Sequence, residues 1–244
     1  LLTNKGVNAD YVRQIINLTQ TTSGSYLLLA SLDISRRNLA LRGEESFAKV
    51  MDMAEYARRE INEIGGYYAY GKELVNGTSV YDYDVTKLSV HTLGLGLAGI
   101  EVYDLLRDEY DIQIEFGDVS NILAYISIGD RLQDIERLVG ALADIARIYK
   151  KDSTGMLSGE FISPIVARSP QEAFYSAKES LPVEKTEGRI SGEFVMCYPP
   201  GIPILAPGEM ITDEIIQYIL YVKEKGCSMQ GTEDKSVNNL KVLV

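Results

Sequence analysis

Three glycines with the spacing G-x-G-x-x-G stand where an extended stretch gives way to a helical pattern: Gly94, Gly96 and Gly99. The extended stretch covers Lys87 to Leu93, and the helical pattern covers Ile100 to Tyr110. This arrangement is typical of a turn that cradles a dinucleotide pyrophosphate at the start of a helix. Glu115 ends the next apolar run about where such folds place a ribose-binding carboxylate. One hypothesis is therefore an NAD-binding oxidoreductase.

The neighbouring strand patterns disfavour that hypothesis. The first strand of a doubly wound fold is buried on both faces and nearly continuous in Val, Ile and Leu, whereas KLSVHTL alternates. Only GDVSN separates IQIEF from ILAYISI, which suits an antiparallel connection rather than a crossover helix. Bulky Tyr103 stands four residues after Gly99, where close packing of a helix on a strand favours a small side chain. The glycines are therefore interpreted as a strand-to-helix turn that needs backbone freedom, and dinucleotide binding is kept as an alternative.

The composition indicates which classes of partner the chain can bind. Its 244 residues suffice for a sizeable core, and no apolar run approaches the ~20 residues that cross a bilayer, so no membrane partner is expected. A formal charge of -11 without clustered Lys and Arg argues against nucleic acid. An acidic surface can attract a cationic small substrate, although acidity also serves solubility alone.

Histidine and cysteine are scarce in this chain. A single histidine, His91, argues against a His-rich metal site and a histidine-based triad, and its alternating surroundings predict an exposed or hydrogen-bonded strand residue. Cys197 and Cys227 lie outside any C-x-x-C pair, so we expect free thiols in a reducing compartment. A single bridge between them is left open.

The first quarter of the chain is helical in pattern. Helical periodicity runs through residues 9–63, and the segment TTSGS interrupts it, so two helices are expected. Thr22, Ser23 or Ser25 is suited to cap the second helix, which begins near Tyr26.

The pattern changes to a compact α/β unit after Gly65. We expect helices over 98–110 and 131–150, with strands over Leu88–Leu93, Ile112–Phe116 and Ile122–Ile128. Residues 151–160 are polar and contain glycine, as linkers do. The segment beyond carries most of the prolines and a helix expected from about Thr212 to Lys225.

Three separated stretches resemble the bacterial ornithine/lysine/arginine decarboxylases, in the right order and over essentially the whole chain. TTSGSYLLLASLDISRR resembles the segment after their cofactor lysine, and YDYDVTKLSVHTLGLGLAGIEVYDLLRDEYDIQIEFGD resembles their small domain. Most specific is GRISGEFVMCYPPGIPILAPGEMIT, residues 188–212, which is similar to the hallmark of their C-terminal domain.

The resemblance implies an α/β (α+β) fold with three parts. Residues 1–64 would be the end of the large domain of pyridoxal-phosphate fold type I with long connecting helices. Residues 65–152 would form a small mixed-sheet α/β domain. Residues 158–244 would form a proline-rich α+β C-terminal domain.

The resemblance also implies an activity. The family uses pyridoxal phosphate to decarboxylate arginine, lysine or ornithine, yielding polyamine precursors and CO2, in cytoplasmic homodimers or higher homo-oligomers. The lysine that carries the cofactor would fall upstream of Leu1, because Lys5 follows the matching position and no His-Lys pair occurs here. We therefore expect the chain alone to be an inactive C-terminal portion, and we assign no catalytic residue and no metal ligand within it.

By the same resemblance, three hydroxyl side chains would bind the phosphate of the cofactor of the neighbouring subunit: Thr21, Thr22 and Ser23. Hydroxyls and N–H groups at a helix start suit a dianionic phosphate. The chain has Gly24 where the family shows proline, and glycine loosens the turn that presents the hydroxyls. The structural alternative is that Thr22 and Ser23 are plain helix caps.

The proline-rich YPPGIP segment predicts a rigid loop near two polar groups, Tyr198 and Glu209. A carboxylate such as Glu209 or Glu193 would pair with the distal cation of a basic substrate. Alternatively, Glu209 caps or begins the following helix, and Arg189 pairs with a nearby acid to hold the domain together.

A noncatalytic role remains as a further alternative. In that interpretation the long helices and the proline-structured tail form an assembly or regulatory module for a partner that carries its own active site.

Overall fold

The computed structural model describes residues 6–153, 162–198 and 200–244. The chain forms two compact units, and the boundary between them lies between Ala48 and Lys49. Most of the expected linker at 151–160 lies outside the described residues, as does Pro199 of the YPPGIP segment. The domain boundaries expected at 64/65 and around 152–158 stay predictions.

The first unit is helical, as the periodicity predicts. Helix α1 spans Ala9–Thr19, and the Asn8 side chain caps it by accepting hydrogen bonds from the N–H groups of Asp10 and Tyr11. Helix α2, Tyr26–Ile64, begins in this unit and ends in the second. The interruption at TTSGS is therefore confirmed.

A four-stranded sheet organises the first part of the second unit. Its strand order is β1 (Tyr68–Ala69), β2 (Lys87–His91), β4 (Asn121–Tyr125) and β3 (Phe116–Gly117). Every neighbouring pair in this sheet is antiparallel over the described strands, and Val90 lies opposite Ile122. The expected mixed sheet is thus an antiparallel one. The dinucleotide alternative is wrong for the same reason, since that fold needs parallel strands joined by crossover helices.

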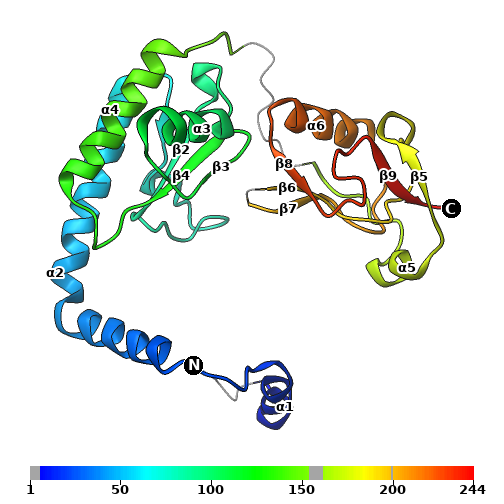
Figure 1. The fold of residues 1–244 in the computed structure, drawn as a ribbon, viewed down its shortest axis with the longest axis horizontal. Helices are drawn as coiled ribbons and strands as arrows, with labels where there is room; N and C mark the ends of the chain where they lie inside the picture. The colour runs from blue at the N-terminus through cyan, green and yellow to red at the C-terminus, as the bar shows by residue number, and fades with distance from the viewer. Residues whose placement is uncertain (1–5, 154–161, 199) are drawn as a thin grey trace. The chain divides into compact units, whose positions relative to one another are not determined.

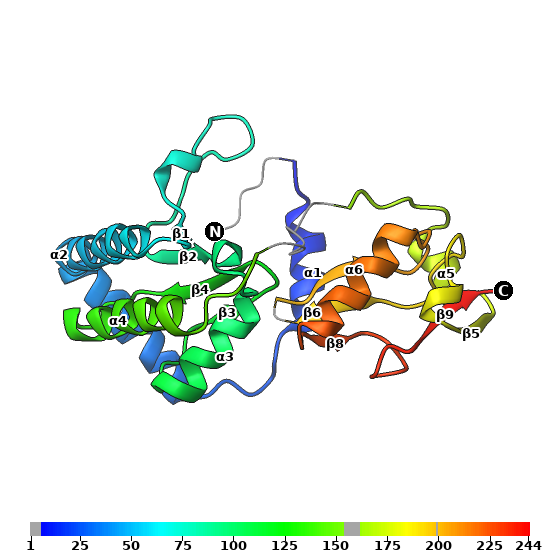
Figure 2. The ribbon, with the colours of Figure 1, turned by 90° about the horizontal axis from the view of Figure 1, so that it is seen from above.

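The sheet buries one face against helices. Alternate residues of β2 and β4 point into the core, whereas their neighbours are half-buried or exposed, as the alternating pattern predicts. Helix α4 (Leu132–Ile148) lies beside the C-terminal half of α2 (Figures 1 and 2). Both helices contribute to the same core: Val50, Ala54, Ala57, Ile61, Leu88, Val90, Ile122, Ala124, Ile135, Leu138, Leu142 and Ile145.

The glycine-rich turn is a place of close backbone contact. A 3-10 turn over Leu93–Leu95 leads into helix α3, Gly99–Tyr110, and Gly96 adopts a φ of +69° that side chains disfavour. A Cβ at Gly94 would lie 2.7 Å from the Gly66 carbonyl oxygen, and one at Gly96 would lie 2.6 Å from the Lys151 carbonyl oxygen. A Cβ at Gly99 would overlap the Asn121 carbonyl outright. The motif therefore exists because backbone packs on backbone, and nothing larger than hydrogen fits.

A glycine on the facing strand makes room for the bulky Tyr103 of α3. Gly117 of β3 faces α3, and a Cβ there would contact the Gly99 carbonyl and lie 2.7 Å from Tyr103 Cβ. The small residue that close packing demands is thus on the strand, not on the helix.

The strand expected over Ile112–Phe116 is mostly wrong. Helix α3 ends at Tyr110, and the next residue, Asp111, has a φ of 53° that lets the Ile112 N–H reach the Leu106 carbonyl. Regular strand pairing begins only at Phe116. Ile114 is nevertheless buried, because the segment that joins α3 to β3 packs its side chain against the core. The expected strand over Leu88–Leu93 stops at His91, since Leu93 already belongs to the 3-10 turn.

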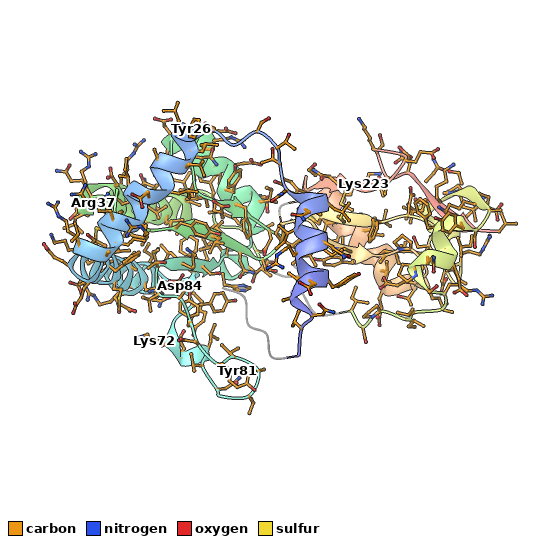
Figure 3. All side chains as sticks on the ribbon, turned by 90° about the horizontal axis from the view of Figure 1, so that it is seen from below. Tyr26, Arg37, Lys72, Tyr81, Asp84 and Lys223 are labelled. Atoms are coloured by element: carbon orange, nitrogen blue, oxygen red, sulfur yellow. The ribbon has the colours of Figure 1, made fainter. Side chains whose placement is uncertain are left out.

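A long loop over residues 70–86 projects from the sheet, with Lys72 and Tyr81 marked on it in Figure 3. Buried Arg58 of α2 holds its base, donating to the carbonyl oxygens of Tyr70 (2.7 Å) and Lys87 (3.0 Å). A buried guanidinium needs such acceptors because an unpaired one is strongly destabilising.

The C-terminal lobe, residues 162–244, has its own core. Strand β5 (Lys178–Pro182) pairs with β9 (Asn239–Leu243), and β6 (Val195–Tyr198) lies between β7 (Ile202–Leu205) and β8 (Ser228–Gln230). Two helices complete the lobe, α5 (Pro170–Tyr175) and α6 (Asp213–Glu224), and the sequence predicted α6 to within one residue at each end (Figure 1). Short 3-10 turns occupy Lys72–Leu74 in the projecting loop and Val183–Lys185 here.

Helices in the described part of the chain are too short or too polar to cross a bilayer.

We predict opposite effects of the same substitution at two glycines. Gly99→Ala should lower the free energy of unfolding by about 3 kcal/mol, because a methyl group displaces the backbone of β4. Gly140→Ala in α4 should raise it by about 1 kcal/mol, because no atom lies within 4 Å of the new methyl group and alanine favours the helix. Denaturant unfolding curves measure both. A neutral Gly99→Ala variant would contradict the packing explanation.

Candidate functional site

The hydroxyl-rich segment predicted to bind phosphate lies between α1 and α2 in the first unit. Thr21, Thr22 and Ser23 are all exposed. The Ser23 N–H donates to Thr21 Oγ1 at 3.3 Å, which turns the backbone before α2. Within the described residues, the hydroxyls of Thr22 and Ser23 make no hydrogen bond of their own. They remain open to a ligand.

The start of α2 shows that Ser25 holds the capping position. Its carbonyl oxygen accepts the first hydrogen bond of the helix, from the Leu29 N–H at 3.0 Å. Thr22 and Ser23 stand before that position, so they are not plain caps of this helix. The first turn of α2 contains no acidic residue, which leaves its N–H groups and the positive end of the helix dipole uncompensated. The hydroxyls of Thr22 and Ser23 and the N–H groups of the first turn of α2 are the kind of donors that bind a dianionic phosphate.

An exposed apolar ridge continues along α2 from this point. None of its apolar side chains is buried in the part of the chain that the structure describes. They are between 49% and 87% exposed: Tyr26, Leu27, Leu28, Leu29, Leu32, Ile34, Leu39 and Leu41. Figure 3 marks Tyr26 at the first turn of the helix. Apolar surface of this extent is typical of a contact surface. The run YLLL, apolar on every side of a helix, was the signal for it.

Tyr198 ends strand β6 and is exposed. Gly201 turns the chain back with a φ of +86°, and a Cβ there would lie 3.3 Å from the Tyr198 ring. The phenol is therefore presented beside a tight turn, as the proline-rich segment predicts.

Glu209 is half-buried and caps its own turn. Its Oε2 accepts a hydrogen bond from the Ala206 N–H at 2.8 Å, and its backbone N–H donates to the Ala206 carbonyl. Helix α6 begins later, at Asp213, with the Thr212 hydroxyl as its cap. The alternative in which Glu209 caps or begins that helix is wrong, because three residues separate them.

Two other charged residues hold the C-terminal lobe together. Glu193 accepts hydrogen bonds from the N–H groups of Glu233 (2.8 Å) and Lys241 (2.7 Å), so both carboxylate oxygens are engaged by backbone. Arg189 bonds to Glu179 at 2.6 Å and to the Leu243 carbonyl at 2.7 Å. The predicted structural pairing of Arg189 is confirmed. Glu193 is less suited than Glu209 to a substrate cation.

The electrostatics of the glycine-rich turn centre on Glu101. Burial acts to raise its pKa, but the Lys151 ammonium at 2.8 Å, the Ala98 N–H and Lys225 outweigh burial and hold the pKa below its usual range. Glu101 is thus a structural anion that completes the start of α3.

His91 is a half-buried strand residue whose Nδ1 lies 3.3 Å from Asn121 Oδ1, which confirms the hydrogen-bonded interpretation. In the part of the chain that the structure describes, no three His, Cys, Asp or Glu side chains converge as metal ligands do.

Comparison with known proteins relates these features to a family. Residues 2–134 match the Orn/Lys/Arg decarboxylase major domain, and residues 159–235 match the Orn/Lys/Arg decarboxylase C-terminal domain. The chain is 40% identical over 240 residues to an arginine decarboxylase from Bacillus subtilis, a match that covers 97% of this chain and 49% of that protein. It is 41% identical over 243 residues to an arginine decarboxylase from Halalkalibacterium halodurans, with the same coverage.

The fold agrees with these matches. The Francisella novicida lysine decarboxylase LdcF superposes with a TM-score of 0.73 and 18% identity, over 98% of this chain and 46% of that chain. The chain spans about half the length of these two arginine decarboxylases. Two family domains matched in order, on a fold of the same kind, establish that the chain belongs to the Orn/Lys/Arg decarboxylase family.

Proposed function

We propose that this chain forms the C-terminal part of a pyridoxal-phosphate-dependent decarboxylase of basic amino acids, with arginine as the first candidate substrate. The observation that carries the proposal is the match of both family domains in order, together with 40% identity to proteins named arginine decarboxylase. The exposed hydroxyl segment before α2 supplies a chemically fitting cofactor contact.

Thr21, Thr22 and Ser23 would hold the phosphate of the cofactor. Thr22 and Ser23 have hydroxyls free to donate, and the first turn of α2 adds N–H groups and a favourable dipole. When bound, pyridoxal phosphate supplies an electron sink for the charge left on the substrate as CO2 departs. The residues of this chain contribute by fixing the position and orientation of the phosphate end.

Tyr198 and Glu209 would bind the distal end of the substrate. The phenol of Tyr198 is exposed, and Glu209 uses Oε2 for its own turn while its charge remains available to a cation. A guanidinium or ammonium group pairs best with a carboxylate that is already held in place. The formal charge of -11 would also raise the local concentration of a cationic substrate.

The partner proposed for the apolar ridge of α2 is the rest of the enzyme, in a homodimer or a larger homo-oligomer. A noncatalytic assembly role remains the second candidate, because the same ridge would serve it equally.

Activity measurements distinguish the two candidates. The complete protein should release CO2 from arginine when pyridoxal phosphate is supplied, and the 244-residue chain alone should show no turnover. Lysine and ornithine, assayed in parallel, define the substrate preference. A complete protein that decarboxylates none of the three would contradict the enzyme proposal and favour the assembly role.

The phosphate contact predicts a cofactor-affinity effect. Thr22→Ala with Ser23→Ala in the complete protein should weaken pyridoxal-phosphate affinity about tenfold or more, because hydrogen bonds to a charged group contribute about 1.5–3 kcal/mol each. Spectroscopic titration of the cofactor measures this. Ser31→Ala is the matched control, since the Ser31 hydroxyl bonds to the Leu28 carbonyl within the helix and should not affect affinity. Equal affinities in all variants would remove the assignment.

The substrate contact predicts a change in KM. Glu209→Gln should raise KM for arginine about tenfold with little change in kcat, because the amide oxygen still accepts from Ala206 while the charge is lost. Glu193→Gln is the control, and it should lower thermal stability without raising KM. A Glu209→Gln variant with an unchanged KM would show that this carboxylate serves only its turn.

A further inference from the structure

The two cysteines of the chain meet in the C-terminal lobe. Cys197 belongs to β6, and Cys227 lies between α6 and β8, directly before Ser228. Each is 8% exposed. Neither takes part in the proposed decarboxylation, so their association calls for a separate explanation.

The sheet register brings the two thiols to the same face. In the antiparallel pairing of β6 with β8, Cys197 lies opposite Met229, and Cys227 is two residues from Met229. Residues two apart along a strand point to the same side, so Cys227 is the diagonal neighbour of Cys197. The Cys227 N–H donates to the Val222 carbonyl at 3.1 Å, which fixes the turn that carries it.

The two thiols lie in one buried cluster, and their contact affects their pKa values in opposite directions. Contact with Cys227 lowers the pKa of the Cys197 thiol, although burial opposes this. The same contact, together with burial, raises the pKa of the Cys227 thiol. Cys197 therefore ionises first, and Cys227 donates its proton toward the resulting thiolate.

The surroundings exclude large reagents. The thiols pack in an apolar cluster with Ala98, Ile100, Val119 and Val222. Nearby Asp118 adds negative charge that opposes ionisation of both thiols, so the contact between them is what favours the Cys197 thiolate. An oxidant that reaches this pair has to be small.

We propose that Cys197 and Cys227 form a peroxide-sensitive dithiol that closes to an intramolecular disulfide between β6 and the turn after α6. Cys197 Sγ attacks one oxygen of hydrogen peroxide, the O–O bond breaks, and Cys197 becomes a sulfenic acid with release of water. Cys227 Sγ then attacks Cys197 Sγ, the S–O bond breaks, and a second water leaves with the Cys227 proton. The two thiols lose two electrons, and the peroxide gains them.

Closure would cross-link β6, which carries buried Val195, to the turn that follows α6, which carries buried Ile219 and Val222. A cross-link between segments so far apart in sequence restricts the unfolded chain, so the oxidised lobe should unfold at a higher temperature than the reduced one.

The test uses the 244-residue chain, whose two cysteines make the thiol count unambiguous. After treatment with hydrogen peroxide, the intact mass should fall by two hydrogens, and both thiols should become unreactive to alkylation in denaturant. Peptide mapping should find Cys197 linked to Cys227, and dithiothreitol should restore both thiols. Retained thiols, over-oxidised cysteines or an intermolecular dimer as the main product would overturn the proposal.

Two single variants test whether Cys197 is the thiol that attacks the peroxide. In Cys227→Ser and in Cys197→Ser the remaining thiol has no cysteine partner, so peroxide should add one oxygen to the intact mass instead of removing two hydrogens. The oxygen should be added faster to Cys197 than to Cys227, because the pKa is lowered at Cys197 and raised at Cys227. Equal rates of oxygen addition would remove Cys197 as the attacking thiol.

Discussion

Close contact of backbone with backbone at the glycine-rich turn is the constraint on which the sheet-bearing part of the structure depends. Gly94 meets Gly66, Gly96 meets Lys151, and Gly99 meets the carbonyl of Asn121. These contacts set helix α3 directly on the antiparallel sheet and bring Glu101 within reach of Lys151. The motif resembles a phosphate cradle in sequence, but its backbone approaches other backbone instead of a ligand.

Buried and half-buried charges in this chain mostly serve the backbone. Arg58 holds the projecting loop, and Glu193 holds the segments before and within β9. Such groups are expensive to bury unless every polar atom finds a partner, and here backbone groups of loops and strand ends provide those partners. The hydroxyls of Thr22 and Ser23 differ from them, because they are exposed and uncommitted. This difference separates the structural charged residues from the two hydroxyls proposed to bind the cofactor phosphate.

The elements that the sequence predicted well are those with long periodic patterns. Helices α3, α4 and α6 lie where periodicity placed them, since their apolar stripes are long enough to specify one face. Ile112–Phe116 was predicted as a strand because its alternation is correct, yet the left-handed Asp111 delays pairing until Phe116. For the candidate site, the sequence predicted which residues take part but not which groups they contact. Thr21, Thr22 and Ser23 followed from the resemblance, and Tyr198 and Glu209 followed from their place near the proline-rich segment. The partners of Glu209 and Glu193 were not foreseeable, since they come from contacts with backbone groups.

The sequence by itself determined the family, the helices, and the antiparallel connection through GDVSN, because these depend on local periodicity and short-range geometry. Only the tertiary structure decided why three glycines are spaced as they are, which carboxylates are already engaged, that YLLL stays exposed, and that Cys197 meets Cys227. The glycine contacts, the partners of Glu193 and the cysteine pair each depend on residues far apart along the chain. Their approach is set by how the core packs, which no local pattern encodes.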